Sequence, residues 1–410
     1  MENKNLENRD FSPLSELSKS CIVNVYIFVS DALRWDAVPD SVTELGETYR
    51  AVASGLSTPQ AMPSIATGQY PTRHGVTWFN HQLPDDCETI FEFSGIDTAF
   101  TDCKLRRQLN RVLGNPSEKD VDELSSPFLC VELDHGGHAP FPDMPDKTPA
   151  ETMEQVDGDE EKLRVLYQKG VHNSAERFKE RIDYLSDRGI LEETLIIFTS
   201  DHGELLGEYN GFTGHGYPPT PELAYVPMTF IHESLRNGYQ GEALLRHTDI
   251  FPTLADIFNV NYDYSNLDGT SLLGTVPKQR VGYSHCTVHP PMKWRETILD
   301  PIYKGPSIWD EDGGYVFPDI GVSKRVFLGV YDAFESGYTS SFNKSKSSLS
   351  RLQDTIPTYV ANPGKYGNPT IESKAAREEV DRVLNQELMD SGQITLSDET
   401  IDRLKNLGYR

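Results

Sequence analysis

The chain has 410 residues, which suffices for one large α/β domain with a sizeable core or for two domains that share an interface. Its 63 Asp and Glu residues outnumber its 38 Lys and Arg residues, so the formal net charge is -25. This charge repels nucleic acid and anionic membrane surfaces, so we expect no nucleic-acid partner. An anionic ester substrate would be repelled as well, so a site for one would need local positive charge, of which metal ions are the simplest source.

Cysteine usage and hydropathy narrow the class of protein further. The cysteines are odd in number, scattered, and form no CxxC pair, so they argue against a disulfide framework and against a zinc-thiolate site. The N-terminal segment is polar, and no later stretch is long and apolar enough to span a bilayer. We therefore expect a cytoplasmic protein without a membrane span.

The first predicted element is a strand over residues 22–30 (IVNVYIFVS), an apolar run rich in β-branched and aromatic side chains. Such a run is typical of a central strand that is buried on both faces of a parallel sheet. The run ends at Asp31. A carboxylate is therefore expected at the carboxyl end of a buried strand.

A helix start is predicted in the segment over residues 55–75, where Ser57 and Thr58 precede Pro59. Proline suits the first helical position, and a hydroxyl beside it commonly caps the helix. The free backbone N–H groups and the helix dipole at such a start also favour an alkoxide and a bound oxyanion. An ordinary helix cap and a catalytic hydroxyl are both consistent with this pattern.

Two further strands and a long helix follow. The apolar runs over residues 128–133 (FLCVEL) and 195–200 (LIIFTS) are followed directly by Asp134 and Asp201. Between them we expect a surface loop over 140–160 and a helix over 161–188 that breaks near Gly170. Because open parallel sheets bind ligands beyond the carboxyl ends of their strands, the three aspartates are expected to share one crevice.

Beyond residue 275 the pattern weakens, and only the last run, SDETIDRLKNLGYR, predicts a helix. The sequence therefore predicts an α/β fold, with a doubly wound, mostly parallel central sheet flanked by helices and a smaller C-terminal subdomain. We place the catalytic domain over residues 20–275 and the C-terminal subdomain or extension over 276–410.

Four runs, taken in order, carry a resemblance to a known family. They are VSDALRWD (29–36), STPQAMPSIATGQYPTRHGV (57–76), HAPF (138–141) and TSDHGELLGE (199–208). Their order and rough spacing resemble the signatures of sulfatases and related enzymes of the alkaline phosphatase superfamily, over residues 22–260. The resemblance implies an alkaline-phosphatase-like fold and a metal-dependent hydrolase of phosphate or sulfate esters.

The nucleophile position departs from the sulfatase signature. Sulfatases that form formylglycine carry Cys or Ser, any residue, Pro, any residue and Arg, whereas STPQA at residues 57–61 lacks the Arg. An ungapped count back from Thr67 and Gly68 places Thr58, not Ser57, at the nucleophile position. Threonine cannot be oxidised to the aldehyde, so the resemblance implies direct attack by the Thr58 hydroxyl.

The resemblance also implies metal ligands. Asp31, Thr58, Asp201 and His202 would bind one divalent metal, zinc or manganese, with magnesium or calcium as alternatives. Asp134 and His138 resemble the second metal site of two-metal members, with His215 as a further ligand, so we expect two metals. In one-metal sulfatases a histidine in the His138 motif instead contacts the sulfate, and a loop histidine bonded to backbone is the structural alternative.

Other polar residues are weaker candidates. Candidate oxyanion contacts are Arg73, Lys104, Arg106 and Arg107, although a solvated surface remains the default interpretation of these residues. His74 is expected to be a structural turn residue, and His247 could be a final ligand. We expect His172, His232, His285 and His289 to be surface or core residues.

The sequence slightly favours a phosphoester substrate because Asp134 and His138 fit two-metal spacing and Thr58 cannot become formylglycine. The alternatives are a one-metal sulfatase and a phospho-headgroup transferase of the same superfamily. A sugar-phosphate mutase would need a larger inserted cap domain, and a non-catalytic module has no reason to keep such ligands. The expected partner is a small-molecule, glycan or lipid ester, and the oligomeric state is open.

Overall fold

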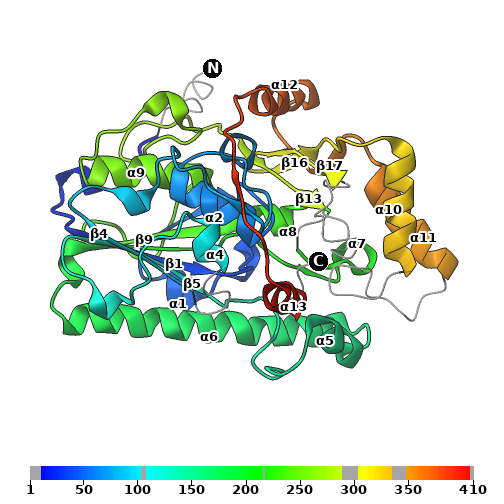
Figure 1. Ribbon diagram of the computed structural model, residues 1–410, viewed down its shortest axis with the longest axis horizontal. Helices are drawn as coiled ribbons and strands as arrows, with labels where there is room; N and C mark the ends of the chain where they lie inside the picture. The colour runs from blue at the N-terminus through cyan, green and yellow to red at the C-terminus, as the bar shows by residue number, and fades with distance from the viewer. Residues whose placement is uncertain (1–10, 103–107, 216–217, 289–302, 335–347, 407–410) are drawn as a thin grey trace, which may run out of the picture.

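The computed structural model describes residues 11–102, 108–215, 218–288, 303–334 and 348–406 (Figure 1). In this part of the chain the largest sheet has eight strands, in the order β10-β2-β9-β6-β1-β5-β4 with β11 also beside β2. The strands are β1 (Asn24–Ser30), β2 (Glu47–Val52), β4 (Asp97–Asp102), β5 (Phe128–Asp134), β6 (Thr194–Thr199), β9 (Tyr225–Ile231), β10 (Tyr239–Gln240) and β11 (Leu245–Arg246).

The pairing confirms the predicted mostly parallel sheet. Strands β4, β5, β1 and β6 run parallel, and only β9 is antiparallel to its neighbours β6 and β2. Val29 pairs with both Leu133 and Thr199, so the carboxyl ends of β5, β1 and β6 lie level. All three predicted strands form within two residues of the predicted bounds, because each apolar run is buried along its whole length.

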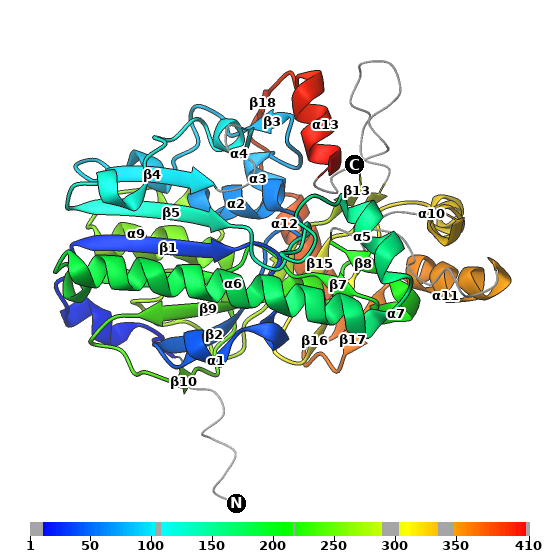
Figure 2. The ribbon, with the colours of Figure 1, turned by 90° about the horizontal axis from the view of Figure 1, so that it is seen from below.

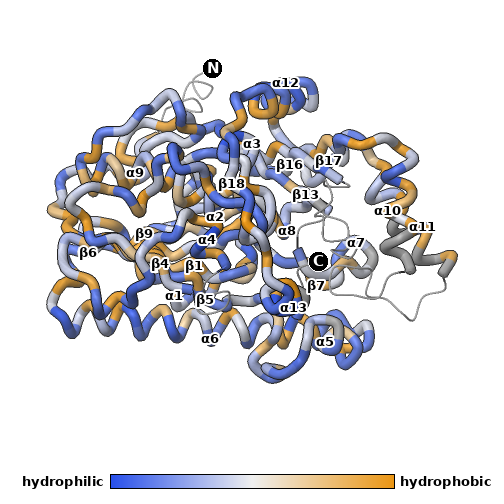
Figure 3. The backbone as a smooth tube through the Cα atoms, viewed as in Figure 1, coloured by the Kyte–Doolittle hydropathy of each residue, from blue (hydrophilic) through white to orange (hydrophobic). Residues whose placement is uncertain are grey.

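Helices cover both faces of this sheet (Figure 2). On one face Val25, Ile27 and Val29 of β1 pack in one core with helices α2 and α9, and on the other Tyr26 and Phe28 pack with α6. Figure 3 shows the hydrophobic stretches gathered along these central strands. The helices around the main sheet are α1 (Asp40–Thr43), α2 (Thr58–Thr67), α3 (Pro71–His74), α4 (Gln108–Val112), α5 (Pro149–Val156), α6 (Glu160–Asp187), α8 (Pro221–Ala224) and α9 (Ile250–Ile257).

Two predictions in the middle of the chain are wrong in detail. Helix α6 continues without a break past Gly170, because this glycine lets the helix approach the loop after β5 closely. A Cβ at Gly170 would lie 2.8 Å from the carbonyl oxygen of Gly136. The segment predicted as a loop, 140–160, contains helix α5, which begins with Pro149 at its first turn and a capping box between Thr148 and Glu151.

The chain after residue 275 forms a smaller sheet and then returns to the main one. The smaller sheet has the order β12-β15-β16-β17, formed by Gly282–Ser284, Ser307–Trp309, Gly313–Val316 and Gly364–Gly367. Beside it lie α10 (Val322–Phe334), α11 (Ser348–Val360) and α12 (Ser373–Leu384) (Figure 1). This smaller unit was expected, and the exact division at residue 275 stays a prediction.

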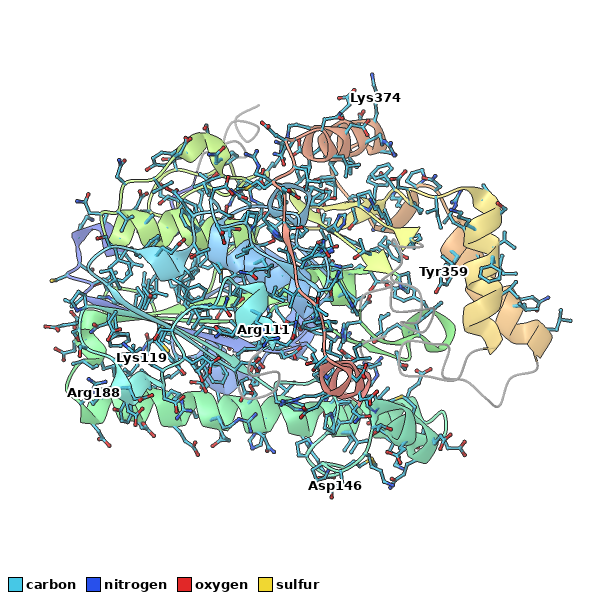
Figure 4. All side chains as sticks on the ribbon, viewed as in Figure 1. Arg111, Lys119, Asp146, Arg188, Tyr359 and Lys374 are labelled. Atoms are coloured by element: carbon cyan, nitrogen blue, oxygen red, sulfur yellow. The ribbon has the colours of Figure 1, made fainter. Side chains whose placement is uncertain are left out.

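The last segment crosses back to the first part of the chain. Strand β18 (Gly392–Gln393) pairs with β3 (His81–Gln82), and Leu404 of α13 (Asp398–Asn406) packs in the main core. Helix α13 confirms the predicted terminal helix for the residues that the structure describes. The carboxyl ends of the main strands point toward the smaller sheet and Tyr359 of α11, whereas Lys119 and Arg188 lie at the opposite end (Figures 2 and 4).

Four of the five cysteines lie in the part of the chain that the structure describes. Cys87, Cys130 and Cys286 are buried and Cys21 is exposed, whereas Cys103 lies outside the described residues. None of the helices in the described part of the chain has an apolar stretch of the length that crossing a membrane requires.

The glycine contact between the loop after β5 and the end of β1 leads to a test. Gly136 has a φ of 57°, and a Cβ there would lie 2.0 Å from the carbonyl oxygen of Asp31. Gly189, with a φ of 70°, has no atom within 4 Å of such a Cβ. We expect Gly189→Ala to lower the free energy of unfolding by about 1–2 kcal/mol through backbone strain alone, and Gly136→Ala to lower it clearly more. Equal losses in urea unfolding would contradict this contact.

Candidate active site

Asp31 is the first residue after β1, and the loop that follows β5 fixes its backbone. The Asp31 N–H donates to the Asp134 carbonyl at 3.1 Å, and the Asp31 carbonyl accepts from the Gly137 N–H at 2.9 Å. The next residue, Ala32, has a φ of 61°, and its carbonyl accepts a hydrogen bond from the Tyr167 hydroxyl at 2.9 Å. This left-handed turn is held from both sides, so the Asp31 carboxylate has a defined position.

Asp201 and His202 occupy the equivalent place after β6. The carboxylate of Asp201 accepts hydrogen bonds from the N–H groups of Ala32 at 3.1 Å and His202 at 2.9 Å, which ties the ends of β1 and β6 together. The His202 Nδ1 lies 2.9 Å from the Gly203 carbonyl. If Nδ1 carries the proton and donates there, Nε2 keeps its lone pair for a ligand.

Thr58 is the first residue of α2, and Ser57 is the residue before the helix. The side chain of Ser57 makes no capping hydrogen bond, so the ordinary cap is not formed. The Thr58 Oγ1 instead lies 3.4 Å from the Nε2 of His202, fully buried. The hydroxyl therefore lies at the helix N-terminus and at the carboxyl ends of the strands at once.

Asp31, Asp201 and His202 form one group whose ligand atoms all lie within 4.8 Å of one another. The Nε2 of His202 is 3.8 Å from Asp31 Oδ1 and 3.4 Å from Asp201 Oδ2, and the three side chains are fully buried. Burial raises the pKa of Asp201, and the neighbouring Asp31 carboxylate raises it further, whereas His202 and a hydrogen bond from Thr58 act in the opposite direction. Two carboxylates and an imidazole at this spacing are a donor set that fits a divalent cation.

Asp134 lies apart from this group. Its two carboxylate oxygens accept hydrogen bonds from Arg177 of α6, at 2.6 Å to Nε and 2.7 Å to Nη2, and the Gly136 N–H donates to it at 2.9 Å. Burial raises the pKa of Asp134, but the Arg177 hydrogen bonds and charge outweigh burial and hold the pKa below its usual value. The carboxylate is thus already neutralised by an arginine.

His138 and His215 form a row of rings with His202. The ring centroids are 4.9 Å apart for His138 and His215, and 4.4 Å apart for His215 and His202. The Nδ1 of His138 lies 2.5 Å from the Ala139 carbonyl, and the Nδ1 of His215 lies 3.4 Å from Glu204 Oε2. The structure therefore brings both histidines beside the cluster, although neither belongs to the three-residue group.

The remaining candidates serve other contacts in the described residues. His247 uses both ring nitrogens on backbone, with Nε2 2.8 Å from the Ser200 carbonyl and Nδ1 accepting from the Ser54 N–H at 3.4 Å. Arg73 lies 3.6 Å from Asp268 in an ion pair. His172 is exposed, whereas His232 and His285 are buried. Lys104, Arg106, Arg107 and His289 lie outside the described residues.

Sequence reasoning missed three residues that support this site. Arg177 binds Asp134, Tyr167 holds the Ala32 carbonyl, and the fully buried Glu204 contacts His215. Glu204 lies within the TSDHGELLGE run over residues 199–208, and its position in this motif could have identified it as a residue of the site. The other two lie on α6, and nothing in their spacing indicates which strand they face.

Comparison with known proteins identifies the family. The sulfatase family matches residues 91–260. Over 410 residues, 97% of this chain and 99% of the relative, the chain is 32% identical to the low-salt glycan biosynthesis sulfotransferase Agl7 of Haloferax volcanii. The chain belongs to the sulfatase family. The expected resemblance to a family of ester-cleaving enzymes is thereby confirmed.

Other sulfatase-family relatives match a smaller part of the chain. Arylsulfatase K of Gallus gallus is 31% identical over 112 residues, which are 27% of this chain and 20% of that protein. Among solved structures, the phosphonate monoester hydrolase of Agrobacterium radiobacter has a TM-score of 0.56 at 17% identity, over 72% of this chain and 87% of its own. A 2-O GAG sulfatase has a TM-score of 0.56 at 15% identity, over 73% and 83%. At these identities the structures show a shared fold.

The buried turn histidine near α2 predicts how stability depends on pH. His74 is fully buried, accepts from the Val76 N–H at 3.1 Å and lies 3.2 Å from the Ser64 hydroxyl, and burial lowers its pKa to about 3. Below the unfolded pKa of about 6.5 only the unfolded state binds this proton. The free energy of unfolding therefore decreases as the pH is lowered, by up to about 1.4 kcal/mol per pH unit. Between pH 6.5 and 5, His74→Gln should lose about 2 kcal/mol less than the parent protein in urea unfolding. The same loss in both proteins would contradict a neutral buried His74.

Proposed function

We propose that the chain is a metal-dependent sulfuryl transferase, which moves the sulfate group of a sulfate ester to a hydroxyl of a glycan through Thr58. The observation that carries the proposal is the Thr58 hydroxyl, buried at a helix start and 3.4 Å from His202 within the Asp31 and Asp201 cluster. The glycan acceptor is suggested by the name of the full-length relative, a glycan biosynthesis sulfotransferase.

A divalent metal fits the side chains of this site. Asp31, Asp201 and His202 would hold it together with the Thr58 oxygen, and the raised pKa of Asp201 reflects two buried carboxylates that a cation would neutralise. When bound, such a metal lowers the pKa of a hydroxyl and polarises the ester oxygens. Oxygen donors with one imidazole suit manganese, zinc or magnesium.

The chain's own residues then position and activate the attacking group. Thr58 Oγ1 attacks the sulfur of the donor ester, the bond from sulfur to the donor oxygen breaks, and the Thr58 proton ends on the released donor alcohol. The N-terminus of α2 favours the negative charge that develops on Oγ1. His215, stacked on His202, and His138, tilted against His215, are the candidates to carry the proton to the leaving oxygen.

The way in which the covalent intermediate has to be cleaved favours transfer over hydrolysis. A formylglycine hydrate carries a second hydroxyl that can expel sulfate, whereas a sulfated threonine has none. The sulfur of the Thr58 ester must therefore be attacked directly by an acceptor oxygen. The acceptor hydroxyl gives its proton to the Thr58 oxygen as that bond breaks, so the enzyme is regenerated. A bound sugar hydroxyl can outcompete water if the site orients it.

Charge balance favours sulfate over phosphate. The sequence favoured a phosphoester and two metals partly because of Asp134, but Arg177 holds both oxygens of that carboxylate. One dication with Asp31 and Asp201 gives a neutral centre. Such a centre suits a sulfate monoester, which carries one negative charge, better than a phosphate monoester dianion. We therefore propose a single metal, with His138 near the transferred group.

The nucleophile is tested by variants of two neighbouring hydroxyls. We expect Thr58→Ala to lower the rate of sulfate transfer from an aryl sulfate to a sugar acceptor by more than about a thousandfold, because the attacking oxygen is lost. Thr58→Ser should keep measurable transfer, and Ser57→Ala should change it little. Mass spectrometry of the sulfated sugar measures each rate. Full transfer by Thr58→Ala, or faster turnover of the matched phosphate ester by the parent protein, would refute the proposal.

Metal content provides a second test. We expect about one divalent ion per chain by elemental analysis, lost in Asp201→Asn and kept in Asp134→Asn if the latter folds. Chelation should lower the melting temperature of the parent protein, because a ligand at a hundred times its Kd stabilises by about 2.7 kcal/mol. Asp201→Asn should be insensitive to chelation. Two ions in the parent protein, falling to one in Asp134→Asn, would instead support the two-metal site.

A further inference from the structure

A second cavity lies near the carboxyl end of the main sheet, with a volume of about 400 Å³. Its lining includes Trp35 in the connection after β1, Arg50 of β2, and Glu311 in the turn between β15 and β16. The volume falls within the range of small-molecule binding sites. Residues 240–244 and Lys278 complete the lining of this space, which the proposed reaction does not use.

The guanidinium of Arg50 is stacked on aromatic rings and not paired with a carboxylate. Its central carbon lies 4.9 Å from the ring centroid of Tyr225 and 5.9 Å from that of Trp35. It makes no ion pair and no hydrogen bond with any residue that the structure describes. An arginine without a carboxylate partner is unusual in this chain, which has 63 acidic residues and only 38 basic ones. Other arginines, such as Arg34 and Arg177, have carboxylate partners.

Glu311 supplies an acceptor on the same cavity. Its Oε1 is buried and accepts no hydrogen bond from the described residues. Burial raises the pKa of Glu311, and Arg50 is near enough to act in the opposite direction. A buried carboxylate oxygen without a donor is costly, and a ligand hydroxyl would satisfy it. At the edge, Lys278 and Glu242 form an exposed ion pair at 3.1 Å, which leaves the cavity without a strong net charge.

We propose that this cavity binds an uncharged sugar ring, as a glycan subsite separate from the Thr58 centre. Trp35 lines the cavity, and its aromatic ring would give the C–H face of a pyranose an apolar surface to pack against. Arg50 provides several fixed donors, and Glu311 an acceptor, for neighbouring hydroxyls. The near-balance of charge in the cavity favours a neutral sugar over a sulfated or phosphorylated one.

The position of the cavity fits an extended acceptor and so rests on the proposed function. Trp35 lies in the same connection as Asp31, and β2 leads into the segment that carries Thr58. Tyr225 lies two residues after Leu223. The Leu223 carbonyl accepts a hydrogen bond from the N–H of Gly203, the residue after His202. A glycan residue held by Trp35 and Arg50 would thus contact segments that lead directly into the metal cluster and Thr58.

Saturation-transfer NMR with the whole chain, magnesium and millimolar methyl glycosides of glucose, mannose and galactose tests this site. We expect at least one of the three to bind the parent protein, and to bind Thr58→Ala equally, because binding here does not need the nucleophile. Arg50→Ala and Glu311→Ala should each raise the Kd at least about tenfold, since each removes hydrogen bonds to the sugar.

Arg377→Ala is the matched control for Arg50→Ala. Arg377 also stacks on an aromatic ring, 5.5 Å from the centroid of Phe317, but it has a carboxylate partner, Asp381 at 3.0 Å, and lies outside the cavity. Its removal should leave sugar binding unchanged. Absence of binding by all three glycosides, or unchanged binding in folded Arg50→Ala and Glu311→Ala, would overturn the subsite. Sugar binding by a parent protein that shows no sulfate transfer from any aryl sulfate would overturn only the proposed reaction.

Discussion

Two carboxylates, Asp31 and Asp201, are buried within a few ångströms of each other at the ends of adjacent parallel strands. Their repulsion disfavours the charged state of the pair, so the surrounding structure has to hold them in place. It does so through hydrogen bonds from Ala32 and His202 to Asp201, and through the Gly136 and Gly137 contacts with Asp31. A cation held by the two carboxylates would remove the repulsion and would thus link metal binding to stability.

Helix α6 provides several of the contacts that hold the site residues in place. Gly170 allows the helix to lie against the loop after β5, Tyr167 holds the left-handed turn at Ala32, and Arg177 neutralises Asp134. An arginine on Asp134 leaves one carboxylate pair for metal, which argues for a single cation. A neutral centre of that kind, with the proposed Thr58 nucleophile, would suit the transfer of a sulfuryl group to an oriented hydroxyl.

Much of the fold could be predicted from the sequence, because long apolar runs such as residues 22–30 allow few structures besides a buried strand. The cluster of Asp31, Asp201 and His202 followed from the same runs, since parallel strands end at one edge. The ion pair of Asp134 with Arg177 could not be predicted, because it depends on how α6 is rotated against β5. Likewise the continuity of α6 at Gly170 depends on a tertiary contact that helix propensity ignores.

The central claim is that the Thr58 oxygen becomes covalently sulfated during turnover. Rapid quenching of the enzyme with an aryl sulfate and no acceptor, followed by peptide mass spectrometry, tests it directly. We predict that the peptide containing Ser57 and Thr58 gains the mass of one SO3 group, that fragmentation places it on Thr58, and that a sugar acceptor removes it. Turnover without modification of this peptide, or modification of Ser57 instead, would contradict the account.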